Sequence, residues 1–128
     1  MSCKNVSTYR LQTLELLARI VGWNNVPIVS TDIVTMTYSA FILRQATGEE
    51  IPVSSHQNIA LTPILDYISD PVVNDDKWNE DEIGYNFHFV PPSAIFTESG
   101  ELYLIRVTMD PVDVDQENLY AVFFIEVE

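Results

Sequence analysis

The sequence predicts an all-β protein, an antiparallel two-sheet sandwich of immunoglobulin-like type with about seven to eight strands. Apolar and polar residues alternate over several stretches that are rich in β-branched and aromatic side chains, as they do in half-buried strands. Turn-forming residues punctuate the chain between these stretches. The 128 residues, 47% of them apolar, are enough to bury one core and contain no repeat or linker. We therefore expect a single domain over residues 1–128.

The first apolar segment, residues 11–21, fits two periodicities. Its leucines at 11, 14 and 17 would share one face of a helix, whereas residues 14, 16, 18 and 20 alternate as in a strand. A mainly β chain offers no obvious place to bury a lone helix, so we expect a strand. Residues 1–10 are expected to form a flexible or edge-pairing N-terminal segment.

Four later segments read as strands: residues 34–43, 85–90, 102–109 and 119–127. Alternation in the first places Val34, Met36 and Tyr38 on one face, with Phe41 opposite. The last is apolar nearly throughout, which suits a strand with neighbours on both sides. Turns are expected at Thr47-Gly48-Glu49, Asp70-Pro71, Pro91-Pro92-Ser93, Ser99-Gly100 and Asp110-Pro111.

The chain is strongly acidic, with 19 Asp and Glu against six Lys and Arg and a net charge of −13. Phosphate backbones repel such a chain, so we expect no nucleic-acid partner. Residues 1–65 are neutral overall, and the whole excess lies in residues 66–128. It concentrates in two expected loops, residues 75–82 and 110–117, which are interpreted as solvated loops, a cation site or a surface for a basic partner.

No membrane or secretory segment is visible in the sequence. The longest apolar run, Leu119–Ile125, is far shorter than the ~20 residues that cross a bilayer, and the first residues lack an apolar signal region. We expect no membrane partner and a cytoplasmic or virion-associated location. Cys3 is alone, which excludes an intrachain disulfide.

The residues give no support for catalysis, and we expect neither an enzyme nor a cofactor. The four glycines are isolated from one another, which excludes a phosphate-cradling loop. Ser55 and His56 are adjacent, but neighbouring side chains of an extended segment diverge and cannot form a nucleophile–base pair. His88 is expected to face solvent or a sheet edge.

Calcium is a weaker alternative, because that ion prefers oxygen ligands. The run that starts at Asp113 fails the EF-hand pattern, with Asn118 at the position of the required Gly and Phe124 at that of the required Glu. A site shared between the two acidic loops stays open. Its candidate ligands are Asp75, Asp76, Asp81, Asp113, Asp115 and Glu117.

The most distinctive stretch is W-N-E-D-E-I-G-Y-N-F at residues 78–87. Gly84 would allow a bend into the following strand, Asn86 would bond local backbone, and Trp78 would plug a sheet edge. An aromatic ligand platform that includes Trp78 is the less favoured interpretation. Further on, Gly100 and Tyr103 match the placement of a tyrosine corner.

The W-x-x-D-x-x-G-Y-N-F pattern, followed by residues 91–96 and by Gly100 with Tyr103, resembles one group of proteins. These are small, mostly uncharacterised immunoglobulin-like β proteins that are encoded among phage and prophage virion-structure genes. The motifs span residues 78–107, a looser pattern spans residues 14–127, and the acidic segment 110–118 departs from it. The resemblance implies a virion component or an accessory of virion assembly, without catalytic residues.

The expected function is that of a non-enzymatic structural or interaction module, which self-associates or docks to another protein. Trp78, Tyr120 and Phe124 are the expected interaction residues, because an unpaired edge and an apolar final strand invite pairing. The alternative is a ligand- or carbohydrate-binding sandwich that uses Trp78, with calcium as an optional aid. An acidic decoy of DNA is disfavoured, since its acids would have to follow one face.

Overall fold

The computed structural model confirms an all-β, two-sheet sandwich and describes residues 2–8, 14–22, 25–78 and 80–128. The strands are β1 (Ser2–Thr8), β2 (Leu16–Ala18), β3 (Ile33–Arg44), β4 (Glu49–Pro52), β5 (Ile59–Ala60), β6 (Ile68–Val73), β7 (Tyr85–Phe89), β8 (Leu102–Pro111) and β9 (Leu119–Val127). Short 3-10 turns are η1 (Ser30–Asp32), η2 (Ile64–Asp66) and η3 (Ser93–Ile95). Over the described ranges there is no α-helix, and no helix that could cross a membrane.

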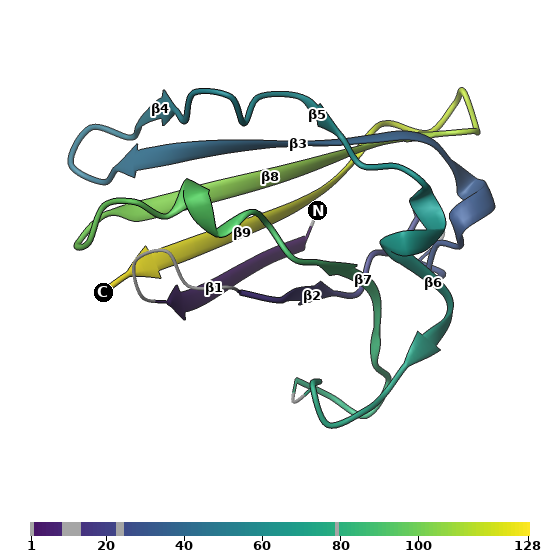
Figure 1. Ribbon diagram of the computed structural model, residues 1–128. Coiled ribbons are helices and arrows are strands. Elements are labelled where there is room, and N and C mark those ends of the chain that lie inside the picture. Colours follow the sequence, from purple (N-terminus) through teal and green to yellow (C-terminus); the bar gives the residue numbers. More distant parts are fainter. Residues whose placement is uncertain (1, 9–13, 23–24, 79) are drawn as a thin grey trace.

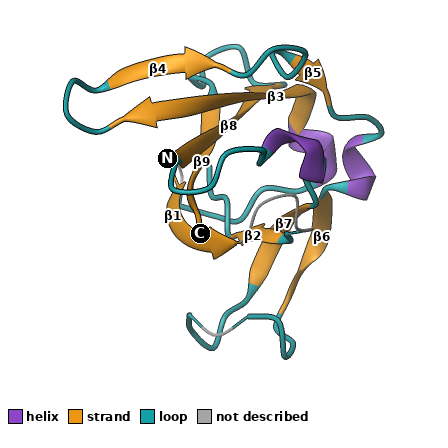
Figure 2. Ribbon diagram, turned by 60° about the vertical axis from the view of Figure 1, so that its left-hand side comes forward, coloured by secondary structure: helices purple, strands orange, loops and turns teal. Residues whose placement is uncertain are grey.

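The larger sheet has the order β1-β9-β8-β3-β4, with β5 also paired to β3 (Figure 1). The smaller sheet has the order β2-β7-β6 and forms the second layer (Figure 2). Strand pairing is antiparallel in the described part of both sheets, except that β1 runs parallel to β9 along its whole length. The first described segment is therefore an edge strand, beside the last strand of the chain.

The four later segments are strands as predicted, with their bounds shifted by at most two residues. The first segment is a strand only over Leu16–Ala18, and its residues 11–13 lie outside the described part. Leu16, Ala18 and Ile20 all point into the main core, in agreement with the alternating pattern. The strand interpretation is thus correct for this segment, but the strand is shorter than predicted.

Two turn predictions are wrong, because both prolines occupy positions where a strand tolerates them. Pro71 lies within β6, an edge strand with an irregular register between Ile68 and Val73. Pro111 is the last residue of β8 and still pairs with Ile33. Both lie where their missing N–H group costs little.

Val34 is a further correction, since it was predicted to share a face with Met36 and Tyr38, which are buried, and is 58% exposed. The pairing of β3 with β8 shifts register between Ile33 and Thr35. Such a bulge inserts one residue and turns its side chain out of the alternation. Beyond it, Met36 and Tyr38 share one face as predicted, and that face is buried.

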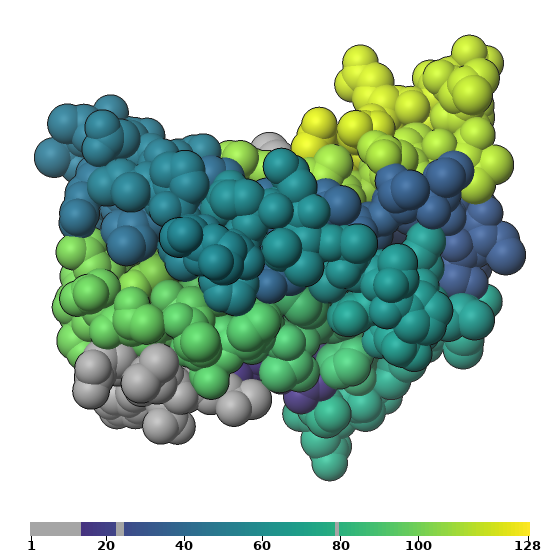
Figure 3. Space-filling view, turned by 45° about the horizontal axis from the view of Figure 1, so that its top comes forward, coloured from purple at the N-terminus to yellow at the C-terminus, as the bar shows by residue number. Residues whose placement is uncertain are grey.

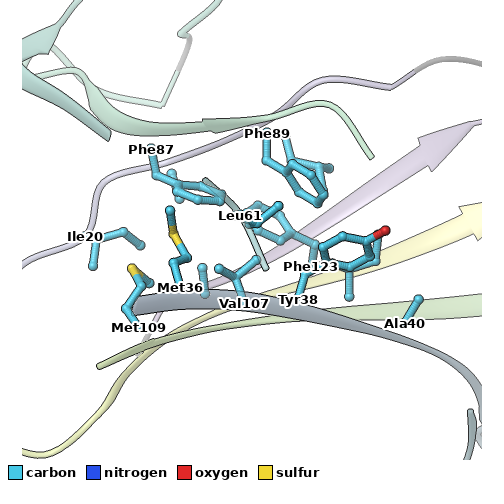
Figure 4. Packing of buried hydrophobic residues seen from close by; sticks show 14 of the residues in the cluster. Ile20, Met36, Tyr38, Ala40, Leu61, Phe87, Phe89, Val107, Met109 and Phe123 are labelled. Carbon is cyan, nitrogen blue, oxygen red and sulfur yellow. The ribbon is translucent and has the colours of Figure 1, made fainter. Parts of the chain in front are cut away.

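The core lies between the inner faces of the two sheets (Figure 4). Phe87 of β7 stacks on Phe123 of β9 with 6.0 Å between ring centroids, and Phe89 lies 5.1 Å from Tyr38 of β3. Burying each such side chain stabilises the fold by roughly 1.5–3 kcal/mol. These aromatic contacts hold the layers together without a disulfide.

Tyr103 forms the predicted corner at the start of β8. Its ring is completely buried and meets Phe96 edge to face, at 5.5 Å and 86°. Its hydroxyl oxygen accepts a hydrogen bond from the Glu98 backbone N–H at 3.1 Å. This contact ties the turn before β8 to the body of the sandwich.

Candidate functional site

Asn86 is a buried polar junction between distant parts of the chain. Its side chain is fully buried in β7. Its Oδ1 accepts from the Ile20 N–H at 2.7 Å, and its Nδ2 donates to the carbonyls of Ile20 at 2.8 Å and Ile28 at 3.1 Å. The prediction of local bonds was wrong: the partners lie 58 and 66 residues away. Asn86 therefore holds the segment between β2 and β3 against the smaller sheet.

Asp81 organises the turn that leads into β7. Its Oδ1 accepts hydrogen bonds from Trp78 Nε1 at 2.9 Å and from the backbone N–H groups of Ile83 and Gly84, at 2.9 and 3.2 Å. Its Oδ2 lies 2.7 Å from Arg19 Nη1. The Trp78 hydrogen bond and the other donors hold the pKa of the Asp81 carboxyl well below its usual range. The hydrogen bonds and the ion pair of the Asp81 carboxylate therefore stabilise this turn.

Trp78 packs rather than presenting a ligand platform. It is only 8% exposed and forms a small cluster with Leu17 and Tyr85, apart from the main core. The Tyr85 hydroxyl donates to Asp75 Oδ2 at 3.0 Å, and burial followed by this contact raises the pKa of the Tyr85 phenol. The interpretation of an aromatic ligand platform combined Trp78 with Tyr85 and Phe87, but Phe87 belongs to the main core. Little of Trp78 is therefore open to a partner, and its placement gives no support to the predicted interaction role or to the ligand-module alternative.

The structure does not bring the calcium candidates together. The loops with residues 75–82 and 112–118 leave the sandwich at well-separated places, the lower and upper right parts of Figure 1. Asp75 and Asp81 already accept structural hydrogen bonds within the first loop. Asp113 accepts the Asp115 N–H at 3.0 Å within the second. Within the described ranges no three His, Cys, Asp or Glu side chains are grouped as metal ligands, so a shared site has no geometric support.

The two histidines have structural neighbours. His56 Nδ1 shares a 3.0 Å hydrogen bond with the Tyr38 hydroxyl, whose pKa is raised by burial and then by Tyr67. His88 Nε2 lies 3.4 Å from Glu15 Oε1 on the smaller sheet. Neither arrangement pairs a histidine with a serine nucleophile.

Tyr120 and Phe124 lie on the outer face of the larger sheet, four residues apart on β9. Tyr120 is 36% exposed and Phe124 is half-buried. Phe124 is paired with Leu104 of β8, and Leu104 is paired with Phe41 of β3. Pro52 of β4 continues this row. We call the row of Phe124, Leu104, Phe41 and Pro52 the outer apolar band. Leu104 is buried within it, Phe41 and Phe124 are half-buried, and Pro52 is exposed.

The outer apolar band is bordered by paired charges. Arg106 Nη2 lies 2.9 Å from Glu50 Oε2, with its guanidinium 5.3 Å from the centre of the Phe41 ring. Arg44 Nη1 lies 2.6 Å from Glu101 Oε2, and this contact raises the pKa of Arg44. Two of the chain's six Lys and Arg are thus paired with acids beside the band, whereas the exposed Glu126 of β9 adds a negative charge to the same face.

Sequence reasoning placed Tyr120 and Phe124 on the final strand but missed Phe41, Leu104 and Pro52 as their neighbours. The alternation in residues 34–43 did put Phe41 on the outer face. Its partner on the next strand follows from register, which one strand's sequence does not encode.

A comparison of the chain with protein-family models, curated proteins and solved structures finds no match in any of the three. The site therefore rests on the geometry of this chain alone.

Proposed function

We propose that this protein is a non-enzymatic interaction module that self-associates through the outer apolar band. The observation that carries the proposal is the continuous row of apolar side chains across β4, β3, β8 and β9. The described part of the fold has two layers, so no third layer of strands lies over this face. Apolar bands on an outer face are typical of protein–protein contacts.

The charge distribution favours a second copy of the chain as the partner. Two molecules of charge −13 repel each other over most of their surfaces. Beside the outer apolar band, Arg106 pairs with Glu50 and Arg44 with Glu101. Copies can therefore approach through this face at the smallest electrostatic cost, and the apolar band supplies the attraction.

The same proposal includes an immunoglobulin-like fold and a place among phage-type virion components. The orders β2-β7-β6 and β9-β8-β3-β4 correspond to the B-E-D and G-F-C-C′ strands of immunoglobulin sandwiches. The residues that carry the resemblance to virion proteins, Trp78, Asp81, Gly84 and Asn86, all have packing or backbone-bonding roles. Residues with these roles stabilise the fold, and a stable fold is what a structural component of a virion needs.

Oligomeric state tests the proposal. Size-exclusion chromatography with light scattering, over a range of protein concentrations, should show concentration-dependent association of the native chain. Phe124→Asp and Tyr120→Asp should each shift the protein to monomer, because a charge facing its own copy in an apolar contact is strongly unfavourable.

Val114→Asp is the matched control. It adds the same charge at a side chain that is 94% exposed, on the loop between β8 and β9. This variant should associate as the native chain does, and circular dichroism should show native strand content for all three variants. A native chain that stays monomeric at every concentration overturns self-association, as does equal loss of association in all three variants.

A further inference from the structure

A second surface lies at one end of the sandwich, away from the outer apolar band. It is a pocket of about 380 Å³ between residues 26–32, which precede β3, and residues 111–119, which connect β8 to β9. In Figure 3 the two segments are neighbours at the upper right, in blue and yellow. The pocket combines an apolar lining with acidic groups, and its use is not explained by the fold or by self-association.

The lining is apolar at its base. Ile28 is buried in the main core and Leu119 packs against that core. Pro27 and Pro111 line the pocket from its two segments, and Val112 lines it with more than half of its side chain exposed. These side chains offer a surface for an aliphatic stem rather than for a fully polar ligand.

Each segment also contributes one carboxylate, Asp32 from the first and Asp113 from the second. Asp32 Oδ2 accepts the Val29 N–H at 3.0 Å, and Asp113 Oδ1 accepts the Asp115 N–H at 3.0 Å. Among the described side chains neither carboxylate has a cationic partner. Residues 25–35 and 110–119 contain five acidic residues and no Lys, Arg or His.

The two segments are held together before any partner arrives. The Val112 N–H donates to the Asp32 carbonyl at 2.8 Å, and Ile33 pairs with Pro111 where β3 meets β8. Because the walls are already joined, binding does not have to order them, and preorganisation of this kind favours affinity.

We propose that this pocket receives a Lys or Arg side chain from a protein partner. Such a side chain places its methylene stem on apolar surface while its charged head reaches a polar group. The stem would lie on Ile28, Pro27 and Leu119, and the head would lie between Asp32 and Asp113. The site therefore selects an exposed basic residue flanked by apolar side chains, which contact the exposed Val112 and Val114.

The test uses the full-length protein labelled with nitrogen-15 and the tripeptide acetyl-Val-Arg-Val-amide. The matched probe carries citrulline, which has nearly the shape of arginine but no charge. Titration with the arginine peptide should move amide resonances of residues 26–32 and 111–119 in a saturable way, and the citrulline peptide should not. Binding should weaken as sodium chloride is added, because exposed ion pairs are screened.

The variant Asp32→Asn/Asp113→Asn keeps the acceptor oxygens of both loops and removes both charges. It should raise the Kd of the arginine peptide about tenfold, in line with two exposed ion pairs. Asp76→Asn/Glu82→Gln, which removes two charges from the other acidic loop, should leave the Kd unchanged. Phe124→Asp should also leave it unchanged, so this proposal and self-association can fail separately. Equal binding of citrulline, an unaltered Kd in Asp32→Asn/Asp113→Asn, or equal shifts in residues 75–82 overturns the proposal.

Discussion

At the scale of single residues, two polar side chains do most of the organising around β7. Asn86 satisfies three backbone groups that would otherwise be buried without partners. Asp81 gathers the indole of Trp78, two backbone N–H groups and Arg19 around one carboxylate. Each acts across the fold, so the loss of either affects more than its own strand.

Replacing Asn86 by leucine should destabilise the protein by about 3 kcal/mol or more, because unsatisfied buried groups cost roughly 1–3 kcal/mol each. Urea unfolding should show a lower midpoint with an unchanged slope. Asn118→Leu, the same substitution on an exposed loop, is the control and should stay within about 0.5 kcal/mol of the native chain. A native-like midpoint for Asn86→Leu contradicts the assigned role.

Asp81 links stability to acid pH. Since its pKa is lower in the folded chain than the ordinary value near 4, its stabilisation is present above about pH 4 and is lost as pH falls toward the folded pKa. Asp81→Asn should therefore melt below the native chain at pH 7, and the difference in Tm should shrink below about pH 4.

The control for this series is Asp76→Asn, an exposed carboxyl of the same loop. Its difference from the native Tm should be small and should not follow the same pH profile. A difference between Asp81→Asn and the native chain that is constant from neutral to strongly acid pH is incompatible with the ionised Asp81 stabilising the turn.

At the scale of elements, the pairing of β6 with β7 depends on a close backbone approach. Val73 pairs with Tyr85, and the preceding residue, Gly84, has a φ of +116°. A Cβ atom there would lie 2.3 Å from the Val73 carbonyl oxygen, so the strands would have to separate. Glycine is therefore needed at position 84 for two reasons: there is no space for a Cβ atom, and the backbone has a positive φ.

Gly84→Ala should lower the free energy of unfolding by about 3 kcal/mol or more, through overpacking against backbone and a strained φ. Gly48→Ala separates these causes. Gly48 has a φ of +75° and nothing within 4 Å of its added Cβ, so only the strain of about 1–2 kcal/mol should remain. Thermal or urea unfolding of the two variants, measured side by side, checks the difference. Equal losses would falsify the close-approach argument.

At the scale of the whole molecule, the −13 charge is distributed unevenly. Two ion pairs lie beside the outer apolar band, while two acidic loops leave the sandwich at separate places. Repulsion among the acids opposes folding, and dissolved salt screens it. The two proposed contacts use different parts of this surface: self-association uses the outer apolar band, and a basic side chain would use the pocket between residues 26–32 and 111–119.

Salt should raise the Tm as repulsion is screened, with most of the gain between about 10 and 300 mM sodium chloride, where the Debye length falls below the size of the domain. Calcium chloride at matched ionic strength should raise the Tm no further, because the described acids form no group of metal ligands. Thermal scans with calcium, and with calcium plus chelator, measure this. A calcium-specific rise would restore the calcium site that the geometry disfavours.

Most of the fold prediction came from the alternation of apolar and polar residues along short segments. Alternation located β3, β7, β8 and β9 within two residues of their bounds. Alternation failed at Val34, where a bulge breaks the period. Turn chemistry failed at the prolines in β6 and β8, where an edge strand or a strand end tolerates proline. Tyr120 and Phe124 were found because they lie on one apolar strand, whereas the rest of the outer apolar band lies on three others.

By itself the sequence determined the all-β class, the positions of the main strands, the tyrosine corner and the division of charge between the two halves. These follow from local periodicity, turn chemistry and composition. Only the tertiary structure decided that Asn86 bonds across more than 50 residues, that Trp78 is buried, that the acidic loops stay apart and that Asp32 and Asp113 line one pocket. The reason is physical: register and layer packing bring together residues from distant strands, and no single segment encodes its partner.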